Sequence, residues 1–240
     1  MRIAVLSDIH GNLPALEAVL DALKPYDAIW QLGDVVGYGP QPNEVVTRLA
    51  LEGALGVRGN HDSAALGLLD TESFNDDARA LVEWTAERLE PAARNWLAAL
   101  PLRSVDGAFT LVHGSPRDPT WEYVYSSGVA RANLSAFDTD HCVVGHTHIP
   151  LIFRERDGRM EGVRPLPDAS FELKSERLIV NPGSVGQPRD GDPRASAIML
   201  DTDVGELEWR RVEYPIEQVQ QLMAERDLPL RLIRRLQFGL

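Results

Sequence analysis

The sequence predicts an α/β fold, and the order of its first segments supports this class. Residues 2–6 form a short apolar run that stops at Ser7-Asp8, and residues 28–32 lead in the same way to Gly33-Asp34. After a turn, each run is followed by a helical pattern. Buried strands that alternate with helices are typical of α/β proteins. Because ligands bind at the carboxyl ends of strands in open α/β sheets, these polar residues predict one shared site.

Spacing and proline placement predict the first two helices. In residues 13–24 the leucines recur at helical spacing, and Pro14 stands in the first turn, where its missing N–H has little effect. A second helix is predicted around residues 43–51. Residues 54–57 then form a third strand, which ends at the polar segment Arg58-Gly59-Asn60-His61-Asp62.

The rest of the chain continues with helices and strands. Residues 76–100 are predicted to be helical and to end at Pro101, with Trp84 and Trp96 as packing anchors. Two further helices are predicted from residue 216 onward. Short strands are predicted at residues 109–112, 142–144, 178–180 and 197–200. Since no repeat or long linker interrupts these segments, we expect a single domain over residues 1–240.

Composition excludes several classes of function. The formal net charge of -12 argues against stable nucleic-acid binding, which depends on clustered Lys and Arg. The single cysteine, Cys142, permits no intrachain disulfide and is expected to be a buried strand thiol. No run approaches the roughly 18 apolar residues of a membrane span, and no export signal is recognised. We therefore expect a cytoplasmic protein without a membrane partner.

Most of the histidines lie at the ends of predicted strands, which favours metal binding. Residues two apart on an extended segment point to the same side, so Asp8 with His10, and His146 with His148, can bind one ion together. Imidazole, carboxylate and amide oxygen suit divalent transition metals, and the lack of thiolates argues against a structural zinc site. A carboxylate such as Asp34 can bridge two ions, which lie roughly 3.5–4 Å apart in two-metal hydrolases.

In type and order these motifs resemble the calcineurin-like metallophosphoesterase family. The matching blocks are Asp8-x-His10, Gly33-Asp34, Gly59-Asn60-His61-Asp62, His113-Gly114 and Gly145-His146-x-His148. The resemblance implies a four-layer αββα sandwich of two mixed β-sheets flanked by helices. It also implies a metal-dependent phosphoesterase in which a hydroxide that bridges the metals attacks phosphorus.

Carried over by position, the resemblance implies two divalent metal ions per chain. Asp8, His10, Asp34 and His148 would bind one ion, and Asp34, Asn60, His113 and His146 the other, with Asp34 as the bridge. We expect manganese first, with iron, zinc, nickel and cobalt as alternatives. His61 would donate a proton to the leaving oxygen or stabilise phosphoryl charge, and Asp62 would orient its imidazole.

Residues outside the motifs are candidates for substrate binding. Asn12 could donate to a phosphate oxygen, but it could equally be an ordinary turn residue. Arg58 could clamp phosphate, but it could equally be a surface residue. Trp121, Tyr123 and Tyr125 could form a wall for a nucleobase, or could pack in the core or at a subunit interface. Residues 181–194 resemble a loop that borders the active site in small prokaryotic members.

Small phosphodiesters, nucleotide-derived or cyclic ones among them, are the expected substrates. Protein Ser/Thr phosphatases and dinucleoside-polyphosphate hydrolases of the family usually carry an acidic residue, an arginine and a glycine soon after the bridging aspartate, and here Asp34 is followed by Val35, Val36 and Gly37. The alternatives are a phosphomonoesterase, a protein phosphatase or a dinucleoside-polyphosphate hydrolase. The alternative from a different functional class is a non-catalytic scaffold protein of the same fold. The sequence is also compatible with a homo-oligomer.

Overall fold

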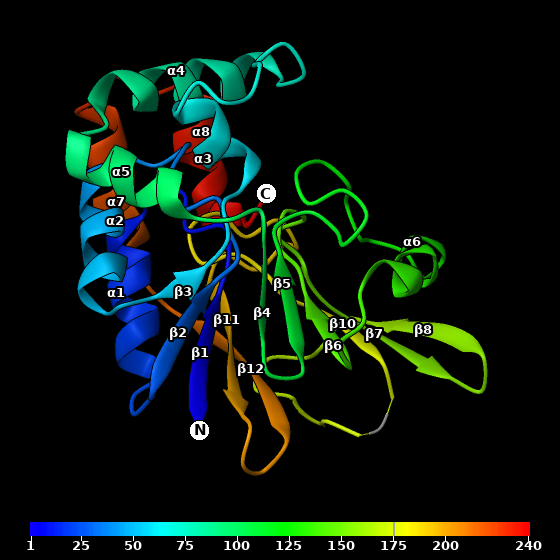
Figure 1. Cartoon of the computed structure of the whole chain (residues 1–240). Coiled ribbons are helices and arrows are strands. Elements are labelled where there is room, and N and C mark those ends of the chain that lie inside the picture. The colour runs from blue at the N-terminus through cyan, green and yellow to red at the C-terminus, as the bar shows by residue number, and fades with distance from the viewer. Residues whose placement is uncertain (175) are drawn as a thin grey trace.

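The computed structural model describes residues 1–174 and 176–240, and its strands form two mixed sheets of six strands each (Figure 1). The first sheet has the order β3 (Leu55–Gly56), β2 (Ala28–Gln31), β1 (Arg2–Leu6), β11 (Ala195–Asp201), β12 (Glu206–Val212) and β9 (Ser170–Glu172). The second has the order β4 (Arg103–Asp106), β5 (Phe109–Val112), β6 (His141–Val143), β10 (Leu178–Pro182), β7 (Pro150–Arg156) and β8 (Arg159–Val163).

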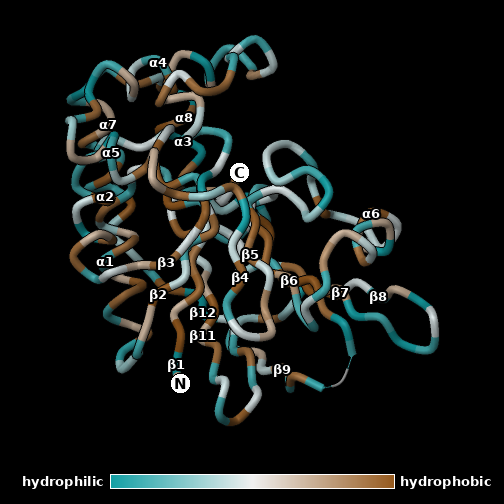
Figure 2. The backbone as a smooth tube through the Cα atoms, in the orientation of Figure 1, coloured by the Kyte–Doolittle hydropathy of each residue, from teal (hydrophilic) through white to brown (hydrophobic). Residues whose placement is uncertain are grey.

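Strand β1 shows how the layers are held together. Its residues alternate, so that Ile3 and Val5 pack in the cluster between the two sheets while Ala4 and Leu6 pack against the helices. The strand is therefore buried on both faces, which explains why it reads as a continuous apolar run rather than as an alternating one. Figure 2 shows the same apolar character along the central strands.

Helices cover the outer face of each sheet, and the predicted four-layer sandwich is confirmed. Most of them gather beside the first sheet, whereas α6 lies over the outer face of the second (Figure 1). The helices are α1 (Leu13–Ala22), α2 (Pro42–Leu51), α3 (Asn60–Ala65), α4 (Asp76–Arg88), α5 (Pro91–Ala99), α6 (Ser127–Asn133), α7 (Ile216–Ala224) and α8 (Leu230–Arg235), with short 3₁₀ turns at Leu134–Ala136 and Leu236–Phe238.

Two features differ from the sequence prediction. The single helix expected over residues 76–100 is in fact two helices, α4 and α5. The backbone is extended at Leu89 and Glu90, and the second helix begins at Pro91. Strands β4, β7, β8, β9 and β12 and the short helices α3 and α6 were not predicted, and β4, β8 and β9 are exposed edge strands without a strong apolar pattern. Cys142 is buried in β6 as expected.

Parallel strands direct their carboxyl ends toward one edge of each sheet. In the first sheet β1, β2 and β3 are parallel, and in the second β5, β6 and β10 are parallel. The segments that follow these six strands carry every motif found in the sequence. Among the described helices, none is long and apolar enough to cross a membrane.

Candidate metal centre

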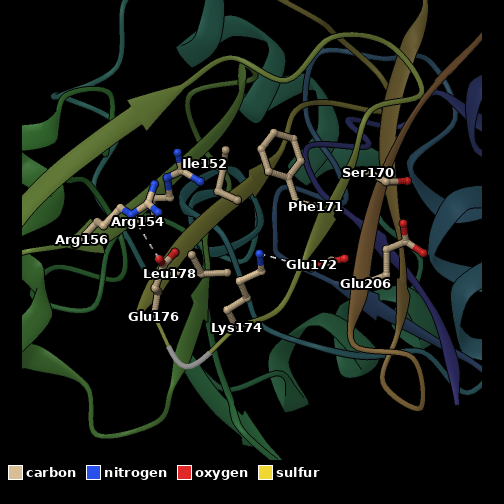
Figure 3. Close-up of a pocket in the computed structure, with 10 residues that line it drawn as sticks. All are labelled: Ile152, Arg154, Arg156, Ser170, Phe171, Glu172, Lys174, Glu176, Leu178 and Glu206. Carbon is tan, nitrogen blue, oxygen red and sulfur yellow. Dashed lines mark ion pairs between the residues drawn. The ribbon is translucent and has the colours of Figure 1, made fainter.

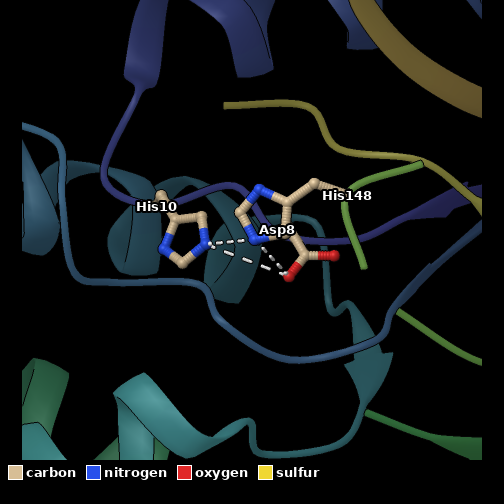
Figure 4. A group of neighbouring side chains, drawn as sticks. All are labelled: Asp8, His10 and His148. Carbon is tan, nitrogen blue, oxygen red and sulfur yellow. Dashed lines mark hydrogen bonds and ion pairs between the residues drawn. The ribbon is translucent and has the colours of Figure 1, made fainter. Parts of the chain in front are cut away.

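The loops after the six parallel strands bring the motif residues together in two groups. Asp8, His10 and His148 form the first ligand group, in which one ligand atom of each residue lies within 4.8 Å of the others (Figure 4). Asp34, His113 and His146 form the second ligand group in the same way. All six side chains are buried, and this division agrees with the one that the family resemblance implied.

In the first ligand group three acceptor atoms face one another. His10 donates from Nδ1 to the Val36 carbonyl at 3.1 Å, and His148 donates from Nδ1 to the Gln187 carbonyl at 2.6 Å. Both rings therefore present a lone pair at Nε2, and these two atoms lie only 3.1 Å apart. Asp8 Oδ1 has no hydrogen-bond partner in the described structure and lies 3.3 Å from His148 Nε2. Such a set fits a divalent cation.

The second ligand group repeats this arrangement and adds an amide oxygen. His113 donates from Nδ1 to the Leu32 carbonyl at 2.8 Å, so its Nε2 atom presents a lone pair once the ring gives up its second proton, as a metal ligand must. That Nε2 atom lies 3.0 Å from Asn60 Oδ1, 3.1 Å from His146 Nδ1 and 3.3 Å from Asp34 Oδ2. His146 Nε2 is buried without a partner in the described part of the chain. Nitrogen and oxygen donors again converge without sulfur.

Asp34 lies between the two groups. Its Oδ2 atom is 3.3 Å from His113 Nε2 and 3.8 Å from His10 Nε2, so the same oxygen faces both. Its Oδ1 atom accepts a hydrogen bond from the backbone N–H of His61 at 2.9 Å, which fixes the carboxylate. This position is the one required of a bridging ligand.

In the metal-free protein, the pKa values of these buried side chains also favour the binding of a cation at this site. Burial raises the pKa of Asp8 to about 7, because no counter-charge in its own group offsets the lost hydration. Burial alone would lower the pKa of His113, but the charge of the nearby Asp34 carboxylate and its hydrogen bond to the ring outweigh this effect and raise the pKa to about 9. Burial lowers the pKa of His10, His146 and His148 well below the usual range. Those three rings are therefore neutral, as metal ligands must be.

Several of these residues have an unusual backbone. Asp8, His10, Asp34, His146 and His148 all have positive φ, between 49° and 67°. Residues other than glycine rarely adopt this left-handed conformation, and each instance costs on the order of 1–3 kcal/mol. Residues with this backbone cluster at functional sites, where the surrounding structure enforces it.

Glycines beside the ligands allow close approach of the loops. A Cβ atom on Gly59 would lie 2.1 Å from Asp34 Oδ1, and one on Gly145 would lie 2.1 Å from the Ser7 hydroxyl. That hydroxyl donates to Asp8 Oδ2 at 2.7 Å. The glycines in the sequence motifs thus make room for hydrogen bonds that hold the carboxylates.

His61 lies beside the two groups but belongs to neither of them. Its ring is 5% exposed and borders the cleft, and its Nδ1 atom has no partner in the described structure. Burial lowers its pKa to about 4. The Asp62 carboxylate does not orient this ring, contrary to our prediction. It accepts instead from the backbone N–H groups of Val36 and Gly59, both at 3.0 Å, and so joins the loops after β2 and β3.

A cleft of about 100 Å³ opens over the centre. Asp34, Asn60, His61, His146 and His148 line its polar side. Its aromatic lining residues include Phe74, Trp121 and Tyr123.

The aromatic side of the cleft contacts the motif histidines directly. Tyr123 stacks on His146, with ring centroids 3.9 Å apart and an angle of 11° between the planes, and it is 43% exposed. Phe74 meets both His61 and Trp121 edge to face. Of the three aromatic residues noted in the sequence, Tyr125 is exposed and lies outside the cleft.

Neither Asn12 nor Arg58 lines this cleft, contrary to the role considered for them. Asn12 caps α1 by accepting from the Ala15 N–H at 3.1 Å, and its amide donates to the Gly186 carbonyl at 3.0 Å. Arg58 donates to the carbonyls of Ala98 and Leu100 at the end of α5 and to the hydroxyl of Ser63. Their donors therefore serve helix termini and loop anchoring.

The loop after β10 borders the centre, as the resemblance implied for residues 181–194. Ser184 donates to the Asp8 carbonyl at 2.8 Å, and Gln187 supplies the carbonyl that orients His148. Asn181 donates to the Gly145 carbonyl and to the Thr147 hydroxyl, on either side of His146. Sequence alone did not distinguish between the two arginines of this loop, Arg189 and Arg194, and in the structure Arg189 lines the cleft.

A larger cavity, of about 440 Å³, lies away from the metal centre, at the side where β7 and β10 face β9 (Figure 3). Four of its charged side chains form two ion pairs within the cavity. Lys174 lies 3.2 Å from Glu172, and Arg156 lies 3.8 Å from Glu176. Among the described residues, no cluster of metal-binding side chains comparable with the two ligand groups lies in this cavity.

Comparisons with known proteins agree with this geometry. The crystal structure of a metallophosphoesterase from Sphaerobacter thermophilus is 45% identical, with a TM-score of 0.93, and the match covers 100% of this chain and 99% of that one. "Uncharacterized protein MJ0912" of Methanocaldococcus jannaschii is 37% identical over 99% of this chain and 98% of its own length. "Phosphodiesterase YfcE" of Escherichia coli is 30% identical over 85% of this chain and 89% of its own length.

A profile of the calcineurin-like phosphoesterase superfamily domain matches residues 1–205. This range contains both ligand groups, His61 and the loop after β10. The phosphoesterase class expected from the motifs is thereby confirmed, and the two groups fit a binuclear metal centre. The chain belongs to the calcineurin-like phosphoesterase superfamily.

Proposed function

We propose that this phosphoesterase hydrolyses small phosphodiesters, nucleotide-derived or cyclic ones among them, with two divalent ions per chain and manganese as the first choice. The observation that carries the proposal is the meeting of the two ligand groups at Asp34 Oδ2, under a small cleft. Asp8, His10, Asp34 and His148 would hold one ion. Asp34, Asn60, His113 and His146 would hold the other.

The residues around the ions have separate tasks. When bound, the ions would supply Lewis acidity and lower the pKa of water, as in other two-metal hydrolases. His61 would donate a proton to the leaving oxygen or stabilise phosphoryl charge, since it borders the cleft without coordinating either group. Its ring is neutral near pH 7 in the metal-free protein, so the proton-donor role requires that the bound phosphoryl anion raise its pKa. Asp62 would position His61 indirectly, through the backbone of Gly59 that precedes the helix carrying both residues.

Three observations support a small diester over a phosphoprotein. The cleft holds only about 100 Å³, and the formal net charge of -12 should slow the approach of highly charged macromolecules. The YfcE relative, 30% identical, bears the name phosphodiesterase. The absence of an arginine after Asp34 is weaker support than the sequence suggested, because Arg189 reaches the cleft from another loop.

Substrate competition tests the proposal. We would compare kcat/KM for bis(4-nitrophenyl) phosphate, 4-nitrophenyl phosphate, cyclic nucleotides and a phosphopeptide, with manganese-loaded protein and metal-stripped protein as the control. We expect the diesters to react at least as well as the monoester, and the phosphopeptide poorly. A tenfold or greater advantage of the monoester or phosphopeptide would replace the diester assignment with a phosphatase.

The remaining expectations concern the protein as a whole. We propose that residues 1–240 act as one domain, since β11, late in the sequence, pairs with β1 at the centre of the first sheet. A cytoplasmic location and the lack of stable nucleic-acid binding are proposed from the composition. Size-exclusion chromatography with light scattering would decide between monomer and homo-oligomer.

A further inference from the structure

Arg189 stands at the edge of the metal centre, in the segment 181–194 that the sequence analysis placed beside the site without giving any of its side chains a role. It lies in the loop after β10, and its backbone N–H donates to the carbonyl of His148 at 3.2 Å. Its side chain lines the same cleft as Asp34, His61 and His148. The position of this guanidinium is therefore coupled to the first ligand group through the main chain.

The side chain is held in place by two neighbours. One terminal nitrogen donates to Gln187 Oε1 at 2.8 Å, and the guanidinium carbon lies 5.6 Å from the centre of the Tyr38 ring. Tyr38 itself is 6% exposed and packs edge to face against His10. A cation over an aromatic face is stabilised there without losing its hydrogen-bonding capacity. Arg189 is thus oriented before any ligand arrives.

Its charge has no anionic partner among the residues that the structure describes. Two neighbouring arginines do have one: Arg194 lies 2.6 Å from Asp192, and Arg211 pairs with Asp190. The Nε atom of Arg189 is buried and makes no hydrogen bond within the described chain. A buried donor without a partner costs roughly 1–3 kcal/mol, so its presence beside a catalytic centre favours an anionic ligand.

We propose that Arg189 binds a non-bridging oxygen of the substrate's phosphoryl group. A planar guanidinium matches the geometry of phosphate oxygens, and Arg189 would supply the cation that relatives take from an arginine soon after the bridging aspartate. The inference rests on the proposed phosphoesterase site, but it holds for diesters and monoesters alike. Arg189 would therefore contribute to phosphate affinity whichever ester the cleft prefers.

The test uses the manganese-loaded protein and inorganic phosphate as the probe. Phosphate affinity would be measured by isothermal titration calorimetry and as a competitive inhibition constant, for Arg189→Gln, Arg189→Lys and the wild type. Arg194→Gln is the matched control, because it changes the same residue type in the same loop but outside the cleft. Metal content would be measured for each protein.

We expect Arg189→Gln to weaken phosphate binding about 10- to 100-fold, the scale of one hydrogen bond to a charged group, at unchanged metal content. Arg189→Lys should recover part of the loss, and Arg194→Gln should bind phosphate like the wild type. Unchanged phosphate affinity in Arg189→Gln would overturn the inference. Loss of metal would do so as well, since it would assign Arg189 to holding the His148 loop.

The result is independent of the substrate assignment. If the wild type prefers monoesters, the diester proposal fails while the effect of Arg189→Gln on inorganic phosphate stands. If diesters react as expected and phosphate affinity is unchanged in Arg189→Gln, only the role of Arg189 fails.

Discussion

The two ligand groups contain the same residue types but are held by different parts of the fold. In the first group Asp8, His10 and His148 all have positive φ, and Ser184 and Gln187 of the loop after β10 support them. In the second group Asp34 and His146 also have positive φ, but His113 follows β5 directly with ordinary backbone, and Asn60 beside it begins α3. All three ligands of the first group therefore have left-handed backbone, and the group depends on Ser184 and Gln187, whereas the second group has one ligand, His113, at the end of a regular strand. We expect the two metal sites to respond differently to the same kind of change.

Asp34 is the residue that both groups share, and its substitution should have the largest effect. Asp34→Asn keeps the size of the side chain but weakens the oxygen that faces His10 and His113. We expect turnover to fall by about 10³-fold or more, the upper range for loss of one preorganised electrostatic group. Elemental analysis should show fewer than the about two ions expected for the wild type. Full activity in thoroughly metal-free wild-type protein would contradict the two-metal interpretation itself.

His61 provides the second test because it contacts the centre without joining either group. His61→Gln should leave the metal content of both sites near that of the wild type and lower kcat by about 10²–10⁴-fold, the usual contribution of a positioned general acid. Paired measurements of kcat and metal content decide this. If the substitution removed an ion, His61 would have to be counted as a ligand.

Ser184→Ala should give the smallest effect and sharpen the contrast between the groups. The Ser184 hydroxyl donates to the Asp8 carbonyl and accepts from the Gln187 N–H, both at 2.8 Å, so it supports the first group alone. We expect affinity for one of the two ions to fall by about 10- to 100-fold, as is usual for residues that orient metal ligands. Calorimetric titration of the metal-stripped protein would resolve the two sites. Equal weakening of both sites would show that the groups are not held independently.

The motif residues were predictable because their chemistry and their place after strands coincide. Asp8, Asp34, His113 and His146 each follow a short apolar run, and parallel strands bring such ends together. The proximity of these four residues can therefore be inferred without knowing the strand register or the topology of the sheets. The α/β class followed from the same pattern, because β1 and β2 are buried on both faces.

The positions of the other residues near the centre could not be predicted from motifs that follow strands. Asn12 and Arg58 lie next to motifs, yet hydrogen bonds to backbone groups elsewhere in the fold turn them away from the cleft. The loop of Arg189 was expected at the centre only from the family resemblance, because Arg189 is 155 residues from Asp34 in sequence and it is the pairing of β10 with β6 that carries the loop there. Asp62 was expected to orient the His61 ring, but it accepts hydrogen bonds from the backbone N–H groups of Val36 and Gly59 instead. These two residues belong to separate loops, so the sequence could not identify them as its partners.

The left-handed backbone of the ligand residues has a consequence for engineering this protein. Glycine adopts positive φ without strain, so replacing Asp8, His10 or His148 by glycine would relax the turn while removing a ligand. Variants selected only for heat tolerance would therefore tend to accumulate losses of catalysis at these positions, an instance of the trade-off between stability and activity. Directed evolution of this scaffold has to select for turnover and thermal stability in the same round.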